Sequence, residues 1–376
     1  MPFPDYRPTV PDMLRRLCAL YGDHEMIVLD EARLTYNEAE RRSAALARGL
    51  LARGVGKGTR VGILMPNGPD WVLAWLAATR IGAVIVPLNT FFQTRELHWI
   101  LRHADVHTLL CVPGMLSHDY LERLEEVEPA LARAQASPFY LSELPQLRQV
   151  FVFGESHRPW AESADRLAEP PADGMPPDFL SLCEDQVHPA DLMAVLYSSG
   201  STADPKGALH TQGTVIRHAF NLASGRDVGS EDRVWSPMPF FWVGGFVFAL
   251  IGNMFAGATT LCELHFDPPS TLAFLEKERV TVALGWPHFG KALADHPDLV
   301  VDPAALERRP RKHAHVPEHQ LPHDADRLFA KHGSLGNLVP LLLVSSRGQN
   351  LHLVALRLRA KHFCEWCSAR RCMPRQ

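Results

Sequence analysis

The chain of 376 residues is 46% hydrophobic and 21% charged, proportions that exclude a mainly disordered, collagen-like or coiled-coil protein. Its 38 Lys and Arg against 42 Asp and Glu give a net charge of −4, so no basic excess points to nucleic acid as a partner. Seven cysteines, an odd number in a long chain, fit the reducing cytoplasm better than a disulfide framework.

The first part of the chain alternates helical patterns with short apolar segments. A helix capped by Asn37 and ending near Gly54 is followed by strands predicted at 61–64, 83–86 and 108–112, with helices beginning at Pro69 and covering 94–102. This alternation indicates βα units, hence an α/β fold with layered, mainly parallel sheets. Because helices cover both faces of such a sheet, its strands can be apolar throughout, as these are.

Residues 154–190 break the pattern. They are rich in proline among acidic and small residues, which predicts a long surface connection resembling a linker. The alternation then resumes with a strand at 192–197, a polar loop and a helix at 212–223. It continues with a helix at 268–277, a strand at 280–284 and a helix at 287–294.

No charged residue occurs between Arg233 and Glu263, so this stretch needs a membrane test. Pro237 and Pro239 interrupt its start, and glycines with Asn253 interrupt the rest. We therefore predict a strand at 234–236, a buried helix at 244–255 and a strand at 258–262, and no transmembrane segment.

The most specific local feature is the run YSSGSTADPKG, from Tyr197 to Gly207, which follows a buried strand. Open α/β sheets bind ligands at the carboxyl ends of their strands. Hydroxyl and backbone N–H groups there can converge on phosphate oxygens, and Lys206 can add a positive charge. The run lacks the Walker A spacing. A solvated Ser/Gly turn without a ligand is the alternative reading.

This run resembles the phosphate-loop signature of the adenylate-forming (AMP-binding) superfamily, which includes acyl-CoA synthetases and luciferases. It matches that signature at every specified position. LTYNE at 34–38, GAVIVPLN at 82–89 and PFFWVGG at 239–245 resemble weaker family elements in the expected order. The resemblance covers residues 10–296 and implies that residues 1–296 are a partial N-terminal large domain of such an enzyme.

The resemblance implies a ligation in two steps: a carboxylate attacks the α-phosphorus of ATP, and CoA thiol then displaces AMP. The implied small molecules are a carboxylic acid, ATP, Mg²⁺ and CoA. Lys206 and Thr202 are the catalytic candidates, with Lys206 holding the leaving pyrophosphate. The phosphate-binding candidates are Ser198, Ser199, Gly200, Ser201, Thr202, Lys206 and Gly207, where the two glycines allow close backbone approach. We assign no protein metal ligand.

The PFFWVGG element borders the acyl channel in the family. Phe241, Trp242, Gly244 and Gly245 are therefore the substrate-binding candidates. Trp242 stands where many relatives carry histidine, and an indole there would favour a fatty or other bulky apolar acid. The alternatives are that the aromatic residues are simply core and that the glycines only allow tight helix packing.

Several family elements are missing from residues 285–376: the YG-TE element, the TGD aspartate for the ribose, the hinge pattern and the C-terminal lysine of the mobile domain. Residues 297–376 therefore form a tail outside the family, either disordered or translated out of frame after a frameshift. The alternative is an appended module, for which His362, Cys364, Cys367 and Cys372 supply possible zinc ligands.

Together these features predict a cytoplasmic, ATP-dependent acyl-CoA ligase of fatty acid metabolism whose activity is impaired by the missing elements. The alternative is an inactive, truncated pseudo-ligase that binds nucleotide or acyl chain at most weakly. The sequence leaves open which acid is used and the oligomeric state.

Overall fold

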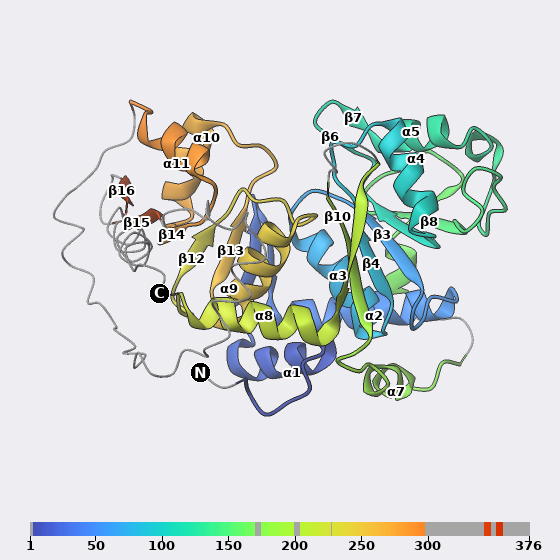
Figure 1. The fold of residues 1–376 in the computed structure, drawn as a ribbon, viewed down its shortest axis with the longest axis horizontal. Helices are drawn as coiled ribbons and strands as arrows, with labels where there is room; N and C mark the ends of the chain where they lie inside the picture. Colours follow the sequence, from blue (N-terminus) through green and yellow to red (C-terminus); the bar gives the residue numbers. More distant parts are fainter. Residues whose placement is uncertain are drawn as a thin grey trace, which may run out of the picture. The chain divides into compact units, whose positions relative to one another are not determined.

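The computed structural model describes residues 3–169, 174–198, 204–226, 228–297, 342–346 and 351–355. The chain divides into two compact units (Figure 1). The first comprises Met1–Glu231 and Pro239–Leu264, and the second comprises Asp232–Met238 and His265–Gln376.

The main sheet of the first unit has the order β11-β10-β4-β3-β5-β8-β9. Its strands are β3 (Arg60–Leu64), β4 (Val84–Pro87), β5 (Thr108–Cys111), β8 (Gln149–Val152), β9 (Ala161–Ser163), β10 (Leu192–Ser198) and β11 (Lys206–Thr211). All neighbours pair in parallel except β10 and β11, which are antiparallel. The predicted α/β class and mainly parallel sheet are confirmed.

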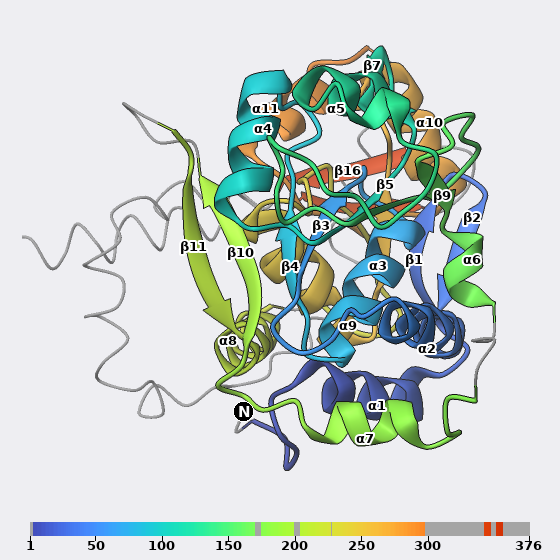
Figure 2. The ribbon, with the colours of Figure 1, turned by 90° about the vertical axis from the view of Figure 1, so that its right-hand side faces the viewer.

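Helices cover both faces of this sheet, which explains its apolar strands (Figure 2). In β3 the side chains of Val61 and Ile63 join the core beneath α2 (Tyr36–Ala52) and α3 (Pro69–Arg80). On the other face Val195 and Tyr197 of β10 join the core beneath α4 and α5. Those two helices span Thr94–His103 and Tyr120–Val127. Successive residues of a strand point to opposite faces, so each strand needs apolar residues at both kinds of position.

The remaining elements of the first unit surround this sheet. A smaller group of strands consists of β13 (Thr259–Cys262), β1 (Glu25–Leu29) and β2 (Ala32–Thr35), with β1 parallel to β13 and antiparallel to β2. The further helices are α1 (Val10–Tyr21), η1 (Leu131–Arg133), α6 (Asp165–Ala168), α7 (Phe179–Asp185), α8 (Gln212–Ser224), η2 (Gly244–Ile251) and α9 (Gly252–Ala256). A short hairpin joins β6 (Gly114–Met115) to β7 (His118–Asp119).

In the second unit, β12 (Arg233–Trp235) pairs in parallel with β14 (Val282–Ala283). The strand β15 (Leu342–Ser346) pairs antiparallel with β14, and β16 (Leu351–Ala355) pairs antiparallel with β15. Helices α10 (Pro268–Lys277) and α11 (Pro287–Ala294) confirm the two predicted helices. Of the residues assigned to the tail, those from 298 onward are described only in β15 and β16, and the four possible zinc ligands lie outside the described residues.

Two local expectations are corrected by the structure, and a third, the buried helix at 244–255, is confirmed with a different start. The N-cap of α2 is Thr35 rather than Asn37, because Thr35 and Glu38 form a reciprocal capping box. The region 154–190 is not only a linker, since it adds β9 to the main sheet and forms α6 and α7. The buried helix at 244–255 begins as the π-helix η2 and continues as α9. Among the described residues, no helix is both long and apolar enough to cross a bilayer.

A buried ion pair holds α7 against the rest of the first unit. The guanidinium of Arg80 is only 2% exposed and donates from Nε to Glu184 Oε1 at 2.6 Å. It also donates to Ser43 Oγ at 2.8 Å and to Glu40 Oε1 at 2.7 Å, both on α2. This network ties the proline-rich region to α2 and α3, which the sequence pattern of that region did not reveal.

Replacing Arg80 with alanine removes the buried cation that hydrogen-bonds to Glu184 and leaves only Arg15, which is 45% exposed and 3.9 Å from the other carboxylate oxygen. We therefore expect the free energy of unfolding to fall by about 3 kcal/mol. The control is Arg33→Ala, which breaks the more exposed pair between Arg33 and Glu25 and should cost less than about 1 kcal/mol. Urea denaturation of each variant measures both values. Equal losses for the two variants would contradict the role given to Arg80.

Candidate functional site at the carboxyl edge of the main sheet

The parallel strands of the main sheet place their carboxyl ends along one edge. In β10, Ala194 lies opposite Ile85 of β4, and the two strands run in the same direction. β10 therefore ends, at Ser198, on the same edge as β4 and β3. This is the edge at which open α/β sheets bind ligands.

β10 is the first strand of a β-hairpin. The sequence predicted that a loop would lead from this strand directly to a helix. β11 returns antiparallel to β10, with Tyr197 opposite Gly207 and Ser198 opposite Lys206. The predicted helix then begins at Gln212. β11 is an edge strand in which no residue is buried, so it lacks the buried alternating pattern by which a strand is recognised in sequence.

The register of this hairpin brings two predicted phosphate ligands together. Ser198 and Lys206 lie eight positions apart in sequence but form a cross-strand pair, and both are exposed. A hydroxyl and an ammonium group are thereby presented side by side at the end of the hairpin. The other predicted ligands, Ser199, Gly200, Ser201 and Thr202, lie outside the described residues.

Gly207 is required by its neighbours within the hairpin. A Cβ atom at this position would lie 2.8 Å from Val195 Cγ1 and 3.1 Å from Cζ of the Tyr197 ring. Both atoms belong to β10, and Tyr197 is buried. Packing therefore requires glycine at position 207, because the Tyr197 ring covers it. This requirement comes in addition to the predicted role of Gly207 in allowing close approach of phosphate.

The aromatic segment 239–245 is attached to the same edge of the sheet. The backbone N–H of Phe240 donates to Asn67 Oδ1 at 2.7 Å, and Asn67 follows the carboxyl end of β3. Asn67 was not predicted as a site residue. Its position three residues after a buried strand is the signal that the sequence offers, but the contact with Phe240 spans 173 positions.

Two aromatic side chains near this segment are core residues. Phe240 and Phe246 are fully buried, and each ring meets Trp71 of α3 edge to face at 5.2 Å. For these two residues the structure therefore supports the core alternative. They anchor the backbone that carries Phe241 and Trp242.

Trp242 differs from them because its side chain is 39% exposed. Its ring meets that of Phe241 at 5.0 Å with an interplanar angle of 75°. Phe241 itself is buried, so the core alternative fits its side chain as it fits Phe240. Gly244 and Gly245 follow at the start of η2. A π-helical turn is common near functional sites, and this one begins with two of the predicted substrate-binding residues.

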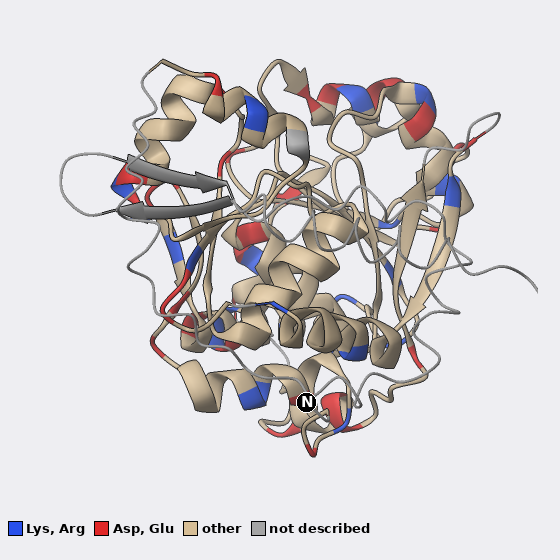
Figure 3. Cartoon of the chain, turned by 60° about the vertical axis from the view of Figure 1, so that its left-hand side comes forward, with Lys and Arg blue, Asp and Glu red and all other residues tan. Residues whose placement is uncertain are grey.

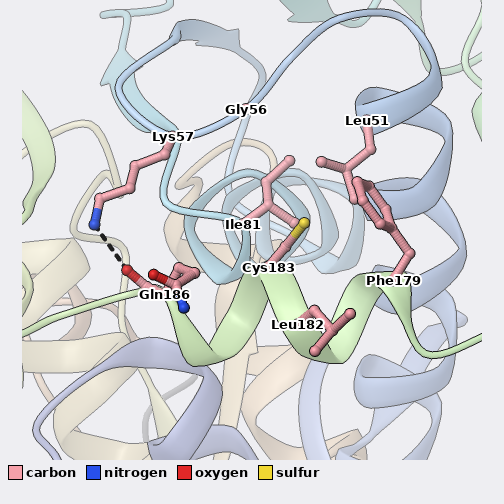
Figure 4. Close-up of a pocket in the computed structure, with 8 residues that line it drawn as sticks. All are labelled: Leu51, Gly56, Lys57, Ile81, Phe179, Leu182, Cys183 and Gln186. Carbon is pink, nitrogen blue, oxygen red and sulfur yellow. Dashed lines mark hydrogen bonds between the residues drawn. The ribbon is translucent and has the colours of Figure 1, made fainter.

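An apolar pocket lies at the opposite edge of the sheet. It has a volume of about 480 Å³ and is lined by Leu51, Gly56, Lys57, Ile81, Phe179, Leu182, Cys183 and Gln186 (Figure 4). Its residues come from α7 and from the segments that precede β3 and β4, so it faces the amino ends of those strands. Lys57 is already engaged there, donating to the Gln186 carbonyl and pairing with Asp191, both at 2.7 Å. We therefore place the candidate site at the carboxyl edge.

Acidic and basic residues are interspersed along the helices rather than separated by sign (Figure 3). Within the described part of the chain, no group of three or more His, Cys, Asp or Glu side chains is arranged to hold a metal ion.

Comparison with known proteins shows the family to which the chain belongs. A model of the AMP-binding enzyme family matches residues 14–348, most of the chain. The chain belongs to the AMP-binding enzyme family. The match extends past residue 296, where the resemblance drawn from the sequence ends.

Relatives of known description agree with this assignment. The acyl-CoA ligase SID4 of Ajellomyces capsulatus is 29% identical over 288 residues, covering 76% of this chain and 47% of that protein. A feruloyl-CoA synthase of Amycolatopsis is 31% identical over 264 residues, covering 70% of this chain and 46% of that enzyme. The chain spans about half the length of the curated relatives it matches.

Solved structures show the same fold. The anthranilate CoA ligase AuaEII, in complex with anthranoyl-AMP, superposes with a TM-score of 0.65 at 20% identity, covering 77% of this chain and 52% of that one. The N-terminal domain of FACL13 from Mycobacterium tuberculosis superposes with a TM-score of 0.59 at 24% identity, covering 78% of this chain and 66% of that one. The expected fold, that of the N-terminal domain of adenylate-forming enzymes, is confirmed.

The crowding around Gly207 gives a direct test of the hairpin. Gly207→Ala should lower the free energy of unfolding by about 1–3 kcal/mol, because its methyl group overlaps Val195 and the Tyr197 ring. Gly56→Ala is the control, since no atom lies within 4 Å of a Cβ built there. Urea denaturation measures both. Unchanged stability in Gly207→Ala would contradict the packing described for Tyr197.

Proposed function

We propose that this chain is an acyl-CoA ligase-type protein that binds Mg-ATP at the β10–β11 hairpin and activates a carboxylic acid as its acyl-adenylate. The observation that carries the proposal is the pairing of Ser198 with Lys206 at the carboxyl edge of the sheet. Membership in the AMP-binding family supports the same reaction class. Transfer of a phosphoryl-linked group needs its negative charge stabilised by positioned donors and cations.

In the proposed complex, the predicted residues of the segment 198–207 bind the phosphates of ATP. The hydroxyl of Ser198 and, beyond the described residues, those of Ser199, Ser201 and Thr202 contact the β- and γ-phosphates, while Gly200 and Gly207 admit them closely. The Lys206 ammonium holds the leaving pyrophosphate as a point charge. The exposed side chains of the hairpin end fit a polyphosphate, because Ser198 and Lys206 both face solvent. Mg²⁺ arrives with ATP as part of the substrate.

The acid is proposed to be fatty or otherwise bulky and apolar. Support comes from the aromatic pair Phe241 and Trp242, held at the same sheet edge by the contact between Asn67 and Phe240. Gly244 and Gly245 would leave room beside them. CoA as the acceptor thiol, a cytoplasmic location and a role in fatty acid metabolism belong to the proposal as expectations of the sequence.

We further propose that this chain, acting alone, turns over slowly. The sequence contains no TGD aspartate to hold the ribose and no C-terminal lysine of the mobile-domain type. Loss of positioning and charge stabilisation together lowers the rate by several orders of magnitude.

The test supplies the full chain with Mg-ATP, CoA and a panel of medium- to long-chain and aromatic acids, and follows both nucleotide binding and pyrophosphate release. We expect Mg-ATP to bind and pyrophosphate to appear far more slowly than the ~1 s⁻¹ or more of an ordinary ligase. Lys206→Ala should weaken Mg-ATP binding by about 10- to 100-fold, through loss of a charge-assisted contact.

The matched control is Lys57→Ala, which removes a lysine at the other edge of the sheet and should leave Mg-ATP binding unchanged. Turnover near ~1 s⁻¹ that Lys206→Ala leaves untouched would refute the assignment of Lys206. A chain that binds no Mg-ATP would be the inactive pseudo-ligase instead.

A further inference from the structure

Helix α4 contacts the residues on both sides of the segment 199–203. At one side, His103 Nδ1 and the Tyr197 hydroxyl are joined by a hydrogen bond of 2.7 Å. At the other, Arg95 Nη2 lies 3.1 Å from Asp204 Oδ1. These residues come from opposite ends of α4, and neither contact is required by the pairing of β10 with β11.

Of these two contacts, the one at His103 is held by more neighbouring groups. The His103 ring stacks on Trp99, one helical turn earlier, with centroids 4.2 Å apart and planes 13° apart. Trp99 also meets the Tyr197 ring edge to face, at 6.0 Å and 89°. Imidazole, indole and phenol therefore fix one another's orientation. The Arg95 pair contributes little, because Arg95 is 83% exposed and solvent screens such pairs.

The packing of helix α4 fixes the position of the backbone that carries His103. Leu97, Ile100 and Leu101 are buried beneath it in the core of the same sheet face as Tyr197. At its start the Glu96 carboxylate accepts from the Gln93 N–H at 3.2 Å. The position of His103 thus follows from the packing of the helix, although the His103 side chain itself is exposed.

Tyr197 connects the fixed position of His103 to the end of the β10–β11 hairpin. Its ring covers Gly207, and it directly precedes Ser198, which pairs with Lys206. The Tyr197 phenol is protonated at neutral pH, as any ordinary tyrosine is, and burial raises its pKa further, to about 12, so it remains a hydrogen-bonding partner for the imidazole. A Tyr197 ring turned away from β11 would leave Gly207 uncovered, and Gly207 adjoins Lys206 as Tyr197 adjoins Ser198.

We infer that His103 is a positioning residue for polyphosphate: through its hydrogen bond to Tyr197 it holds Ser198 and Lys206 in the geometry that binds the β- and γ-phosphates. The inference rests on the proposed function, and it adds a residue that lies outside the phosphate-loop motif. His103 does not touch the nucleotide in this account. Its effect is on the affinity for the phosphate chain and not on the affinity for the nucleoside part.

The experiment measures binding of Mg-ATP, inorganic tripolyphosphate and AMP to the full chain by calorimetric titration. His103→Leu removes the hydrogen bond and should weaken Mg-ATP and tripolyphosphate by about three- to tenfold, the usual worth of one net hydrogen bond. Binding of AMP, which lacks the β- and γ-phosphates, should stay unchanged. General damage to the fold would weaken all three ligands alike.

Two further variants separate the hydrogen bond from packing. His103→Asn keeps a polar atom near the position of Nδ1 and should restore most of the polyphosphate affinity. Tyr197→Phe should weaken polyphosphate as His103→Leu does, and the double variant should be no weaker than either one, because both remove the same bond. His98→Leu, on the same helix, is the matched control and should bind as the unaltered chain does.

Polyphosphate affinity that His103→Leu leaves unchanged would overturn this inference alone. Equal weakening in His103→Leu and His103→Asn would also overturn it, because the hydrogen bond would then have no part in the effect. An unaltered chain that binds neither Mg-ATP nor tripolyphosphate would overturn the proposed function itself, and this inference with it.

Discussion

The register between β10 and β11 is the constraint on which the candidate site depends. Because Ser198 pairs with Lys206, two residues eight positions apart present their side chains together at the sheet edge. A slip of one residue would turn every side chain of a strand to the opposite face. Gly207 helps to fix this register, since Val195 and the Tyr197 ring occupy the space that a larger residue would need.

The rest of the first unit supports that hairpin from both faces of the sheet. Helix α3 packs Trp71 against Phe240 and Phe246, and this packing holds the aromatic segment. Helix α4 brings Trp99 and His103 to Tyr197 on the other face. Ser198 and Lys206, together with the segment that carries Phe241 and Trp242, therefore lie along one edge of the sheet. The proposed reaction between two bound substrates requires such an arrangement.

Much of this architecture could be predicted from the sequence, because it rests on local patterns. Short apolar runs separated by helices gave β3, β4, β5 and β10, since a strand covered on both faces is apolar throughout. The YSSGSTADPKG run identified the family from residues that are consecutive. The helix at Pro69 likewise followed from a single residue type at the first helical position.

Other features depend on contacts between distant residues and leave little trace in the local sequence. The exposed edge strand β11 has no buried face to produce an alternating pattern. Helix α7 sits in a proline-rich region and is held by Arg80, which lies 104 positions from Glu184. The contact between His103 and Tyr197 spans 94 positions, and a surface histidine on a helix carries no sign of its partner.

Amide hydrogen exchange of the full chain, with and without Mg-ATP, tests the central claim most directly, because it compares the two edges of the sheet in one measurement. If the hairpin binds the phosphates, Mg-ATP slows exchange in peptides that contain Ser198 and Lys206 and leaves peptides from α7, beside the apolar pocket, unchanged. Slower exchange confined to α7, with the hairpin unchanged, would contradict the account.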